Sequence, residues 1–396
     1  MRAVPDAVER HEAVVVGAGP GGLAAAAMLS QAGLETLVLE RDRVAASWRR
    51  HYDRLHLHTW RLLSCLPGLR ISSRRGPWVS REGVVGYLEN YVRHHRLNVR
   101  AGTEARRIDR AADGQGWRID TPGGGIEAPV VVVATGYNHR PVLPDWPGKH
   151  TFTGELIHAS DYHNPAPYRG KDVLVVGTGN TGAELCVDLA EGGAGRIRLA
   201  FRTPPHVTLR SAAGVPAQAT AVLLHRLPTA ITDRLFRVTN RLTVGDLGPF
   251  GLPSPQNGAF TDFRERDSVP ILDVGLVQLV KEGRVEPVAA VESFHGSHVR
   301  LADGTEIEPD AVVAATGYRR GLEPLVGHLG VLDERSGRPL RMGGEEHPDA
   351  PGLHFVGYRN PMSGMFWEMS WEARRVARAA AGSVTPADAE RSLEAV

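Results

Sequence analysis

Two glycine-rich turns are the parts of this sequence whose residue types and spacing point most directly to a chemistry. They read Gly17-Ala18-Gly19-Pro20-Gly21-Gly22 and Gly177-Thr178-Gly179-Asn180-Thr181-Gly182. In a turn of this spacing the first glycine makes the bend, the second lets the backbone approach a pyrophosphate, and the third lets the following helix pack closely against the strand. The helix N-terminus presents free N–H groups and the positive end of its dipole to the phosphates. Each turn is therefore a candidate nucleotide-binding site, with a purely structural turn as the alternative.

The residue at the end of the strand after each turn distinguishes the two nucleotides. After the first turn that strand ends at Glu40, and a carboxylate there accepts hydrogen bonds from a ribose diol. After the second turn it ends at Arg202 and Thr203, with no acid. A carboxylate repels a 2′-phosphate whereas an arginine pairs with it, so the second site is predicted to bind NADPH rather than NADH. The alternative for Arg202 is an ordinary solvent-exposed strand end.

Short apolar runs and helical stretches around the turns predict the elements that position them. Buried parallel strands are expected at Ala13–Val16, Thr36–Leu39 and Asp172–Val176. Helices are expected over residues 23–31 and 183–190, directly after the glycines. This order of strand, glycine turn, helix and strand is what the dinucleotide-binding fingerprint requires.

The whole pattern occurs twice. A strand over residues 130–134 leads into Thr135-Gly136-Tyr137, and a strand over residues 311–315 leads into Thr316-Gly317-Tyr318. Hairpin-like stretches with glycine turns precede both strands, at residues 105–128 and 289–308. The duplication predicts an α/β fold with two Rossmann-like dinucleotide-binding domains of three ββα layers, the second inserted into the first. The glycines of the closing turns are expected close to the cofactors, with simple strand-end bends as the alternative.

The remaining segments are expected to complete these domains and a substrate pocket. Residues 220–242 read as helical apart from Pro228, and residues 247–267 as irregular; residues 204–267 are either a substrate lid or a structural insertion. Residues 352–357 read as a last strand, and the helix over residues 364–381 is expected to point its N-terminus toward the first nucleotide. Its aromatic and methionine side chains either line the pocket or pack in the core: Met362, Met365, Phe366, Trp367, Met369 and Trp371.

Composition argues against several other classes of protein. The chain has 396 residues and a net charge of +1, so it fits two or three domains and shows no basic field for nucleic acid. No apolar run reaches the roughly 18 residues of a membrane helix, and the polar N-terminus is unlike a signal peptide. Cys65 and Cys186 form no CxxC pair, and the 17 histidines form no convincing metal cluster. We expect a cytoplasmic protein that binds no membrane, nucleic acid or metal; its oligomeric state is left open.

A longer signature stands between the two glycine turns. It fits the pattern FxGxxxHxxx(Y/F) and reads Phe152-Thr153-Gly154-Glu155-Leu156-Ile157-His158-Ala159-Ser160-Asp161-Tyr162. With this linker the chain resembles the flavin-containing monooxygenases, and in detail the YUCCA-type enzymes of plants. The resemblance covers roughly residues 12–382 and includes the segments at residues 52–58, 180–184 and 269–275.

Three positions bear on the branch of that family. Tyr162 stands where Baeyer–Villiger monooxygenases of the superfamily usually carry tryptophan, which favours a heteroatom-oxygenating or YUCCA-like enzyme. Near His58-Thr59-Trp60 the chain lacks the Thr-Asn pair of animal-type members, and residues 360–369 differ from the glycine-rich plant segment. The substrate therefore stays open among amines, sulfur compounds, 2-oxo acids and carbonyl compounds.

The resemblance implies a cofactor arrangement and a reaction. FAD occupies the first site, in a domain of residues 1–165 and 326–396, and NADPH the second, in residues 166–325 with a helical insertion at about 204–267. Hydride passes from the nicotinamide to flavin N5, and O2 then gives a C4a-(hydro)peroxide that transfers one oxygen atom to a small organic substrate. His158 is expected to position NADP+ near the flavin or to be structural, an acid–base role being open, and Tyr162 is the second candidate catalytic residue.

The residues expected at the cofactors come from the turns and from the matching segments. At FAD they are Gly17, Gly19, Pro20, Gly22, Glu40, Arg41, Trp48, His56, Leu57, Thr135, Gly136, Tyr137 and Gly357. At NADPH they are Gly177, Gly179, Asn180, Thr181, Gly182, Arg202, Thr203, Thr316, Gly317 and Tyr318.

Three other functions use similar glycine turns. A disulfide reductase of this cofactor class needs the CxxC pair that the sequence lacks. An NADPH-dependent flavoprotein reductase that passes electrons to a partner protein needs no linker signature at residues 152–162. A non-enzymatic nucleotide-binding or redox-sensing protein has no use for two intact turns together with that linker. The monooxygenase is thus the leading hypothesis, and the reductase is the alternative.

Overall fold

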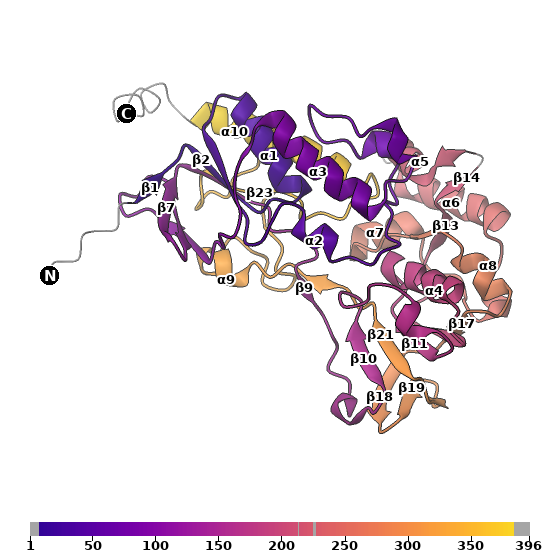
Figure 1. The fold of residues 1–396 in the computed structure, drawn as a ribbon. Helices are drawn as coiled ribbons and strands as arrows, with labels where there is room; N and C mark the ends of the chain where they lie inside the picture. Colours follow the sequence, from indigo (N-terminus) through magenta and orange to yellow (C-terminus); the bar gives the residue numbers. More distant parts are fainter. Residues whose placement is uncertain (1–7, 213, 225–226, 384–396) are drawn as a thin grey trace.

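Two five-stranded parallel sheets form the centre of the molecule (Figure 1). The computed structural model describes residues 8–383 except 213 and 225–226. The first sheet has the order β23 (Leu353–Phe355), β8 (Val130–Val133), β2 (Ala13–Val16), β3 (Thr36–Leu39) and β4 (Asn98–Arg100). The second has the order β10 (Glu155–His158), β21 (Ala311–Ala314), β11 (Asp172–Val176), β12 (Arg196–Ala200) and β17 (Glu286–Val288).

The first sheet is covered on both faces, as its apolar strands require. Alternate strand residues such as Val15 and Val132 pack against helices on one face, and Val14 and Val131 pack on the other. The helices are α1 (Pro20–Gln31), α3 (Arg81–His95) and α10 (Met365–Ser383). The other face is covered by α9 (Glu323–Val326) and by the antiparallel strands β5 (Arg107–Arg110), β6 (Trp117–Thr121) and β7 (Gly124–Ala128), with β1 (Glu9–Arg10) at the edge.

The second sheet repeats these three layers. Val173 and Val175 pack against helices on one face, while Leu174 and Val176 pack on the other face against Phe294. The helices are α4 (Asn180–Gly192) and α8 (Leu276–Lys281). The antiparallel layer consists of β18 (Val291–His295), β19 (His298–Leu301) and β20 (Glu306–Ile307). The predicted fold class, with two Rossmann-like units of three layers, is thereby confirmed.

Between β12 and β17 the chain makes a mostly helical excursion. Its elements are β13 (Val207–Leu209), β14 (Ser211–Ala212), β15 (Val215–Pro216), α5 (Ala217–Leu224), α6 (Thr229–Thr243), η5 (Gly248–Phe250), α7 (Ala259–Arg266) and β16 (Ile271–Asp273). β13 pairs in parallel with β16, so both ends of the excursion are anchored together. The break between α5 and α6 falls at Pro228, as predicted, whereas α7 lies in a stretch expected to be irregular.

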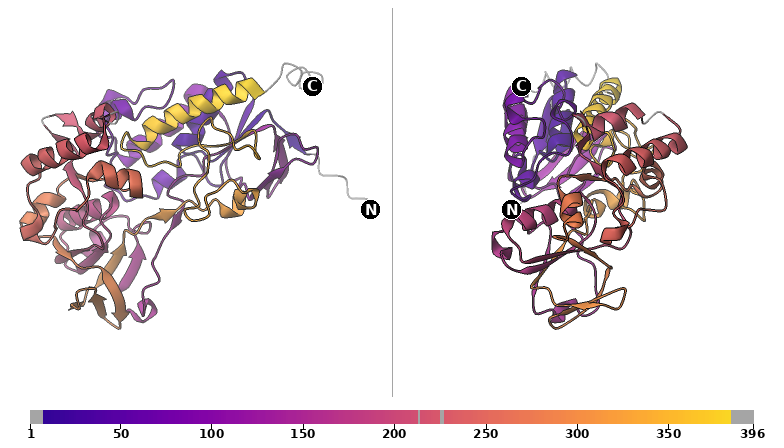
Figure 2. Two further views of the ribbon diagram at one scale, coloured as in Figure 1. Left: turned by 180° about the vertical axis from the view of Figure 1, so that it is seen from behind. Right: turned by 90° about the vertical axis from the view of Figure 1, so that its right-hand side faces the viewer.

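The chain returns to the first sheet after leaving the second. β23 pairs with β8, and α10 then packs along α1; Figure 2 shows α10, in yellow, on the outside of this unit. The shorter connecting elements are α2 (Ala46–Arg49), η1 (Arg61–Leu63), η2 (Ser73–Arg75), β9 (Arg140–Pro141), η3 (Lys149–Thr151), η4 (Ala166–Tyr168), β22 (Tyr318–Arg319) and η6 (Gly327–Leu329). β9 pairs with β22, so the two chain segments that cross between the units run side by side.

Candidate active site

The first glycine turn lies between β2 and α1 and is tightly built on its inner side. Gly17 has φ of +109°, and a methyl group there would lie 2.5 Å from the carbonyl oxygen of Ala134. A methyl group at Gly22 would overlap the carbonyl oxygen of Gly17. At Gly19 it would meet no protein atom within 4 Å. The side of the turn that faces the protein, at Gly17 and Gly22, therefore has no room for side chains. The side at Gly19, at the N-terminus of α1, is open, and a pyrophosphate fits there.

The second glycine turn, between β11 and α4, has the same construction. Gly177 has φ of +116°, and a methyl group there would lie 2.5 Å from the carbonyl oxygen of Ala315. A methyl group at Gly182 would overlap the carbonyl oxygen of Gly177, whereas at Gly179 nothing lies within 4 Å. Both sequence repeats thus fold into the same cradle, open at the middle glycine.

Glu40 follows β3 and is fixed by backbone donors. Its Oε2 accepts a hydrogen bond from Ala18 N at 2.8 Å, and its Oε1 accepts one from Asp42 N at 2.9 Å. The carboxylate is therefore held beside the first glycine turn, with further lone pairs free for a ribose hydroxyl.

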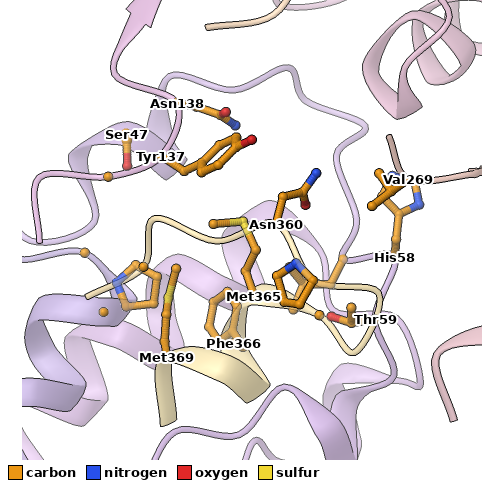
Figure 3. A pocket seen from close by; sticks show the side chains of 18 of the residues that line it. Ser47, His58, Thr59, Tyr137, Asn138, Val269, Asn360, Met365, Phe366 and Met369 are labelled. Atoms are coloured by element: carbon orange, nitrogen blue, oxygen red, sulfur yellow. The ribbon is translucent and has the colours of Figure 1, made fainter. Parts of the chain in front are cut away.

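A pocket of about 720 Å³ extends from the first glycine turn to the helical excursion. Figure 3 shows Tyr137 and Asn138 facing Met365, Phe366 and Met369 across it. Twelve residues that the sequence predicted at the cofactors line this pocket: Gly17, Gly19, Pro20, Glu40, Arg41, Trp48, Leu57, Thr135, Gly136, Tyr137, Asn180 and Gly357. The chain thus gathers most of the predicted FAD residues around one cavity.

The other predicted cofactor residues lie outside the lining of this pocket. They are Gly22, His56, Gly177, Gly179, Thr181, Gly182, Arg202, Thr203, Thr316, Gly317 and Tyr318. Gly22 packs beneath its turn, and His56 points back to the carbonyl oxygen of Arg54 at 2.7 Å. Arg202 is exposed just beyond the end of β12, and no ion-pair partner for it lies within the described residues. Most of the predicted NADPH residues therefore surround the second turn and not the pocket itself.

His158 is the last residue of β10 and is buried. Ser160 N donates to its Nδ1 at 3.0 Å, so Nδ1 carries no proton and Nε2 donates to the carbonyl oxygen of Gly317 at 3.1 Å. Burial lowers the pKa of His158. Its ring also contacts Tyr318 edge-on, at 5.0 Å between centroids. Both nitrogens are occupied by structural hydrogen bonds that tie the linker to the turn after β21, which favours a positioning role.

Tyr162 is also buried away from the pocket. Its hydroxyl donates to Asp188 Oδ2 at 2.8 Å, and its ring stacks on Tyr168 at 5.6 Å. Burial, followed by the hydrogen bond to Asp188, raises the pKa of Tyr162. Two residues of the linker signature, His158 and Tyr162, thus hold the crossing segment against the turn after β21 and against α4.

Side chains of the helical excursion form a second wall of the pocket. These residues had no motif to mark them: Leu235, Phe236 and Thr239 of α6, Phe260 of α7, and Gln218 of α5. Gln218 is buried; its Oε1 accepts from Trp60 N at 2.7 Å and its Nε2 donates to the carbonyl oxygen of Ser363. It joins three distant segments at the pocket, and such a contact has no local sequence signal.

The methionine and aromatic side chains at the start of α10 divide into two groups. Met362, Met365, Phe366 and Met369 line the pocket. Trp367 and Trp371 do not; they pack edge-on against each other at 6.1 Å, and Trp371 is exposed. Four of the six residues therefore line the pocket, which is one of the two alternatives that the sequence left open.

Comparison with known proteins agrees with this geometry. Residues 14–213 match the family model described as pyridine nucleotide-disulphide oxidoreductase. The chain is 37% identical over 340 residues to the rice (Oryza sativa subsp. japonica) indole-3-pyruvate monooxygenase YUCCA1, which covers 84% of each chain. It is 36% identical over 318 residues to a probable indole-3-pyruvate monooxygenase, YUCCA9, of Arabidopsis thaliana, covering 77% of this chain and 74% of that one.

The chain belongs to the YUCCA-type flavin-containing monooxygenases. Among solved structures, a flavin-containing monooxygenase from Stenotrophomonas maltophilia has the same fold, with a TM-score of 0.72 at 22% identity, over 95% of this chain and 99% of that one. Members of the family use FAD and NADPH, and this YUCCA-type chain is a flavin-dependent monooxygenase that acts on a small organic substrate. The reductase alternative is not favoured.

The described residues form neither a membrane-spanning helix nor a metal site. No helix among them is both long and apolar enough to span a bilayer. Within the same part of the chain, His, Cys, Asp and Glu side chains do not gather in threes at a position suited to a metal ion.

Proposed function

We propose that the first glycine turn and its pocket hold FAD, that the second turn holds NADPH, and that the pocket beyond the flavin receives the substrate. The observation that carries this proposal is the free space above Gly19, because it opens directly into the cavity of about 720 Å³. If the turns were only structural, side chains could fill the space at the middle glycine. That space is free of protein atoms in both copies of the motif.

The chain's own residues would hold the two nucleotides in different ways. Glu40 would accept hydrogen bonds from the FAD ribose, and the N–H groups at the start of α1 would bind the pyrophosphate. Arg202 and Thr203, at the exposed end of β12, would bind the 2′-phosphate of NADPH. His158 and Tyr162 would keep the crossing segment in place, so that the two sites face each other.

FAD, when bound, supplies the redox chemistry, since it accepts a hydride from NADPH and reacts with O2. The protein's part is to orient the reactants and to keep water from the pocket. Met365, Phe366 and Met369 from α10 and Phe236 from α6 present apolar surface for this purpose.

The apolar second wall also bears on the substrate class. Leu235, Phe236 and Phe260 suit an aromatic or aliphatic group, and two relatives are named for indole-3-pyruvate. We take an aromatic 2-oxo acid as the first substrate to test, with amines, sulfides and ketones after it.

The proposal includes the domain limits and the cellular location. The FAD domain comprises residues 1–165 and 326–396, and the NADPH domain residues 166–325, with its excursion at about 204–267. Both cysteines are free thiols, which is typical of a reducing compartment such as the cytoplasm.

Oxygen labelling tests the proposed function directly. The purified protein loaded with FAD is supplied with NADPH, ¹⁸O₂ and each candidate substrate, and the product is analysed by mass spectrometry. We expect one labelled oxygen atom per product molecule and a matching consumption of NADPH. NADPH oxidation that yields reduced added acceptor proteins and never a labelled product would instead identify a reductase.

A further inference from the structure

A buried polar cluster lies between the two nucleotide-binding units, and the mechanism above does not use it. It consists of Tyr52 and His58 from the segment before α3, and Glu184 from α4. Glu184 lies one helical turn after Asn180, at the start of the helix that the second glycine turn opens. His58 lines the pocket beside Thr59 (Figure 3). The cluster therefore connects the NADPH unit with the pocket.

The cluster contains one hydrogen bond and one close polar contact. The Tyr52 hydroxyl donates to Glu184 Oε2, and Glu184 Oε1 lies 3.3 Å from His58 Nε2. The His58 Nδ1 is buried and has no hydrogen-bond partner within the described residues. A buried ring nitrogen without a partner is costly unless another group is bound beside it. One nitrogen of His58 therefore lies beside the carboxyl group, and the other is buried without a partner in a residue that lines the pocket.

The protonation of the cluster follows from its burial. The side chain of Glu184 is only 5% exposed, and this burial raises its pKa to about 7. Burial, together with the charge of Arg210, lowers the pKa of His58 to about 4. Between about pH 4 and about pH 7 the pair is thus mainly a neutral carboxylic acid beside a neutral imidazole, and not an ion pair. The charged or titratable groups that act on the cluster are Arg54, His56, Asp188, Arg210 and Tyr318.

We propose that His58 and Glu184 form a proton relay into the pocket, with Tyr52 as the residue that positions the carboxyl group. In this arrangement the Glu184 O–H donates to His58 Nε2, and a rotation of the His58 side chain on binding brings its buried Nδ1–H to a group bound in the pocket. When Nδ1 gives up its proton, Nε2 takes the proton of Glu184, so the imidazole is neutral before and after the transfer.

The balance of the reaction requires such a proton, and in this respect the relay rests on the proposed function. Substrate, O2, NADPH and one proton give oxygenated substrate, NADP+ and water. NADPH supplies both electrons, the O–O bond breaks, one oxygen atom bonds to the substrate and the other leaves as water. The extra proton comes from solvent and must reach a pocket built to exclude water; Glu184 stores it and His58 passes it on.

Three variants test the relay in the FAD-loaded protein. Glu184→Gln and His58→Gln keep the size of each side chain, and we expect each to lower kcat by roughly 100-fold, the lower end of what general acid–base catalysis contributes. FAD content and the KM for NADPH should stay within twofold of the wild type. His58→Ala should lose a similar factor and regain part of it when imidazole is added. His150→Gln, at an exposed histidine of η3, is the control and should keep the wild-type kcat.

The pH dependence gives a second readout. The relay needs the protonated carboxyl group, so the kcat of the wild type should fall as pH rises through about 7, and this limb should be absent from Glu184→Gln. Infrared difference spectra of the resting protein should show a protonated carboxyl band that disappears over the same pH range. Because the pKa of Glu372 is also about 7, Glu184→Gln should lose only the part of this band that Glu184 contributes. This measurement needs no turnover.

Several outcomes would overturn the relay. An unchanged kcat in His58→Gln and Glu184→Gln, or a loss that comes only from FAD release or a higher KM for NADPH, would give these residues a structural role. An infrared titration that is identical in the wild type and in Glu184→Gln would show that Glu184 is ionised throughout. If the wild type itself consumes no O2 with NADPH, the proposed function fails, whereas the infrared titration still decides whether the pair holds its proton.

Discussion

A methyl group at Gly19 would meet no protein atom within 4 Å, although the same group at Gly22 would overlap the backbone of Gly17. Gly19→Ala therefore leaves the protein fold intact and fills only the space assigned to the FAD pyrophosphate. We expect about tenfold weaker FAD binding or worse, which corresponds to about 1.4 kcal/mol. The ratio of flavin to protein absorbance after purification measures it.

The second turn supplies a matched control, because Gly179 has the same free space. Gly179→Ala should purify with the wild-type FAD content and show weaker NADPH binding instead. A Gly19→Ala protein with normal FAD content and normal circular dichroism would contradict the assignment of the first turn.

Arg202 is a single exposed cation, so its effect should be specific to one phosphate group. Arg202→Ala removes a charge-assisted hydrogen bond worth about 1.5–3 kcal/mol, and should raise the KM for NADPH by roughly 10- to 100-fold. The KM for NADH should change little, since NADH lacks the 2′-phosphate. Steady-state kinetics with NADPH and with NADH measures both KM values. An equal rise in the two KM values would mean that Arg202 does not bind the 2′-phosphate.

At the scale of elements, α10 carries a buried carboxyl group whose protonation affects stability. Glu372 is buried, its Oε2 accepts from Gly357 N at 2.8 Å, and burial raises its pKa from 4.5 to about 7. The folded state holds this proton up to about pH 7 and the unfolded state releases it near 4.5, so stability is lost as pH rises between these values.

Glu372→Gln keeps the acceptor oxygen and removes the titration. Relative to the wild type, its free energy of unfolding should rise with pH in this window, by at most about 1.4 kcal/mol per pH unit. Urea unfolding at both ends of the window measures the difference. Glu334→Gln, at an exposed position, should run parallel to the wild type, and a parallel curve for Glu372→Gln would refute the assignment.

The accuracy of prediction from sequence also differs between elements. The apolar strands β2, β3 and β11 were predicted with the bounds they have, because buried parallel strands are nearly continuous apolar runs. Helix α7 was missed: its sequence is mostly polar, and it is held by tertiary contacts such as Asp233 Oδ1 accepting from Phe260 N at 2.7 Å.

The same contrast holds for the site. The glycine turns and Glu40 were visible because a phosphate and a ribose demand fixed residue types at fixed spacing. Gln218, Phe236 and His58 were not assigned to the pocket, since they reach it through tertiary contacts. An apolar wall requires only apolar side chains of suitable size. Many different sequences can form such a wall, so it leaves no recognisable sequence motif.

At the scale of the molecule, the predicted FAD residues come from the turns after β2, β3 and β8, from α2 and the segment that follows it, and from the loop before α10. A ligand that binds all of them binds the folded state alone. At a free concentration of about 100 times its Kd it adds about 2.7 kcal/mol, so removal of FAD should lower Tm by on the order of 5 °C. Calorimetry of the holoprotein and of the FAD-free protein measures this, and an unchanged Tm would argue against a bridging cofactor.

The return of the chain to its first sheet has a consequence for synthesis on the ribosome. The second sheet has all its strands once residue 314 has emerged, because β10 to β21 are contiguous in the chain. The first sheet, although it begins at residue 13, waits for β23 at residues 353–355 and for α10, which ends at residue 383. Domains fold as units during translation. The unit that contains the second sheet is therefore the first that can be completed. The apolar strands of the first sheet must be kept from aggregating until α10 has been synthesised.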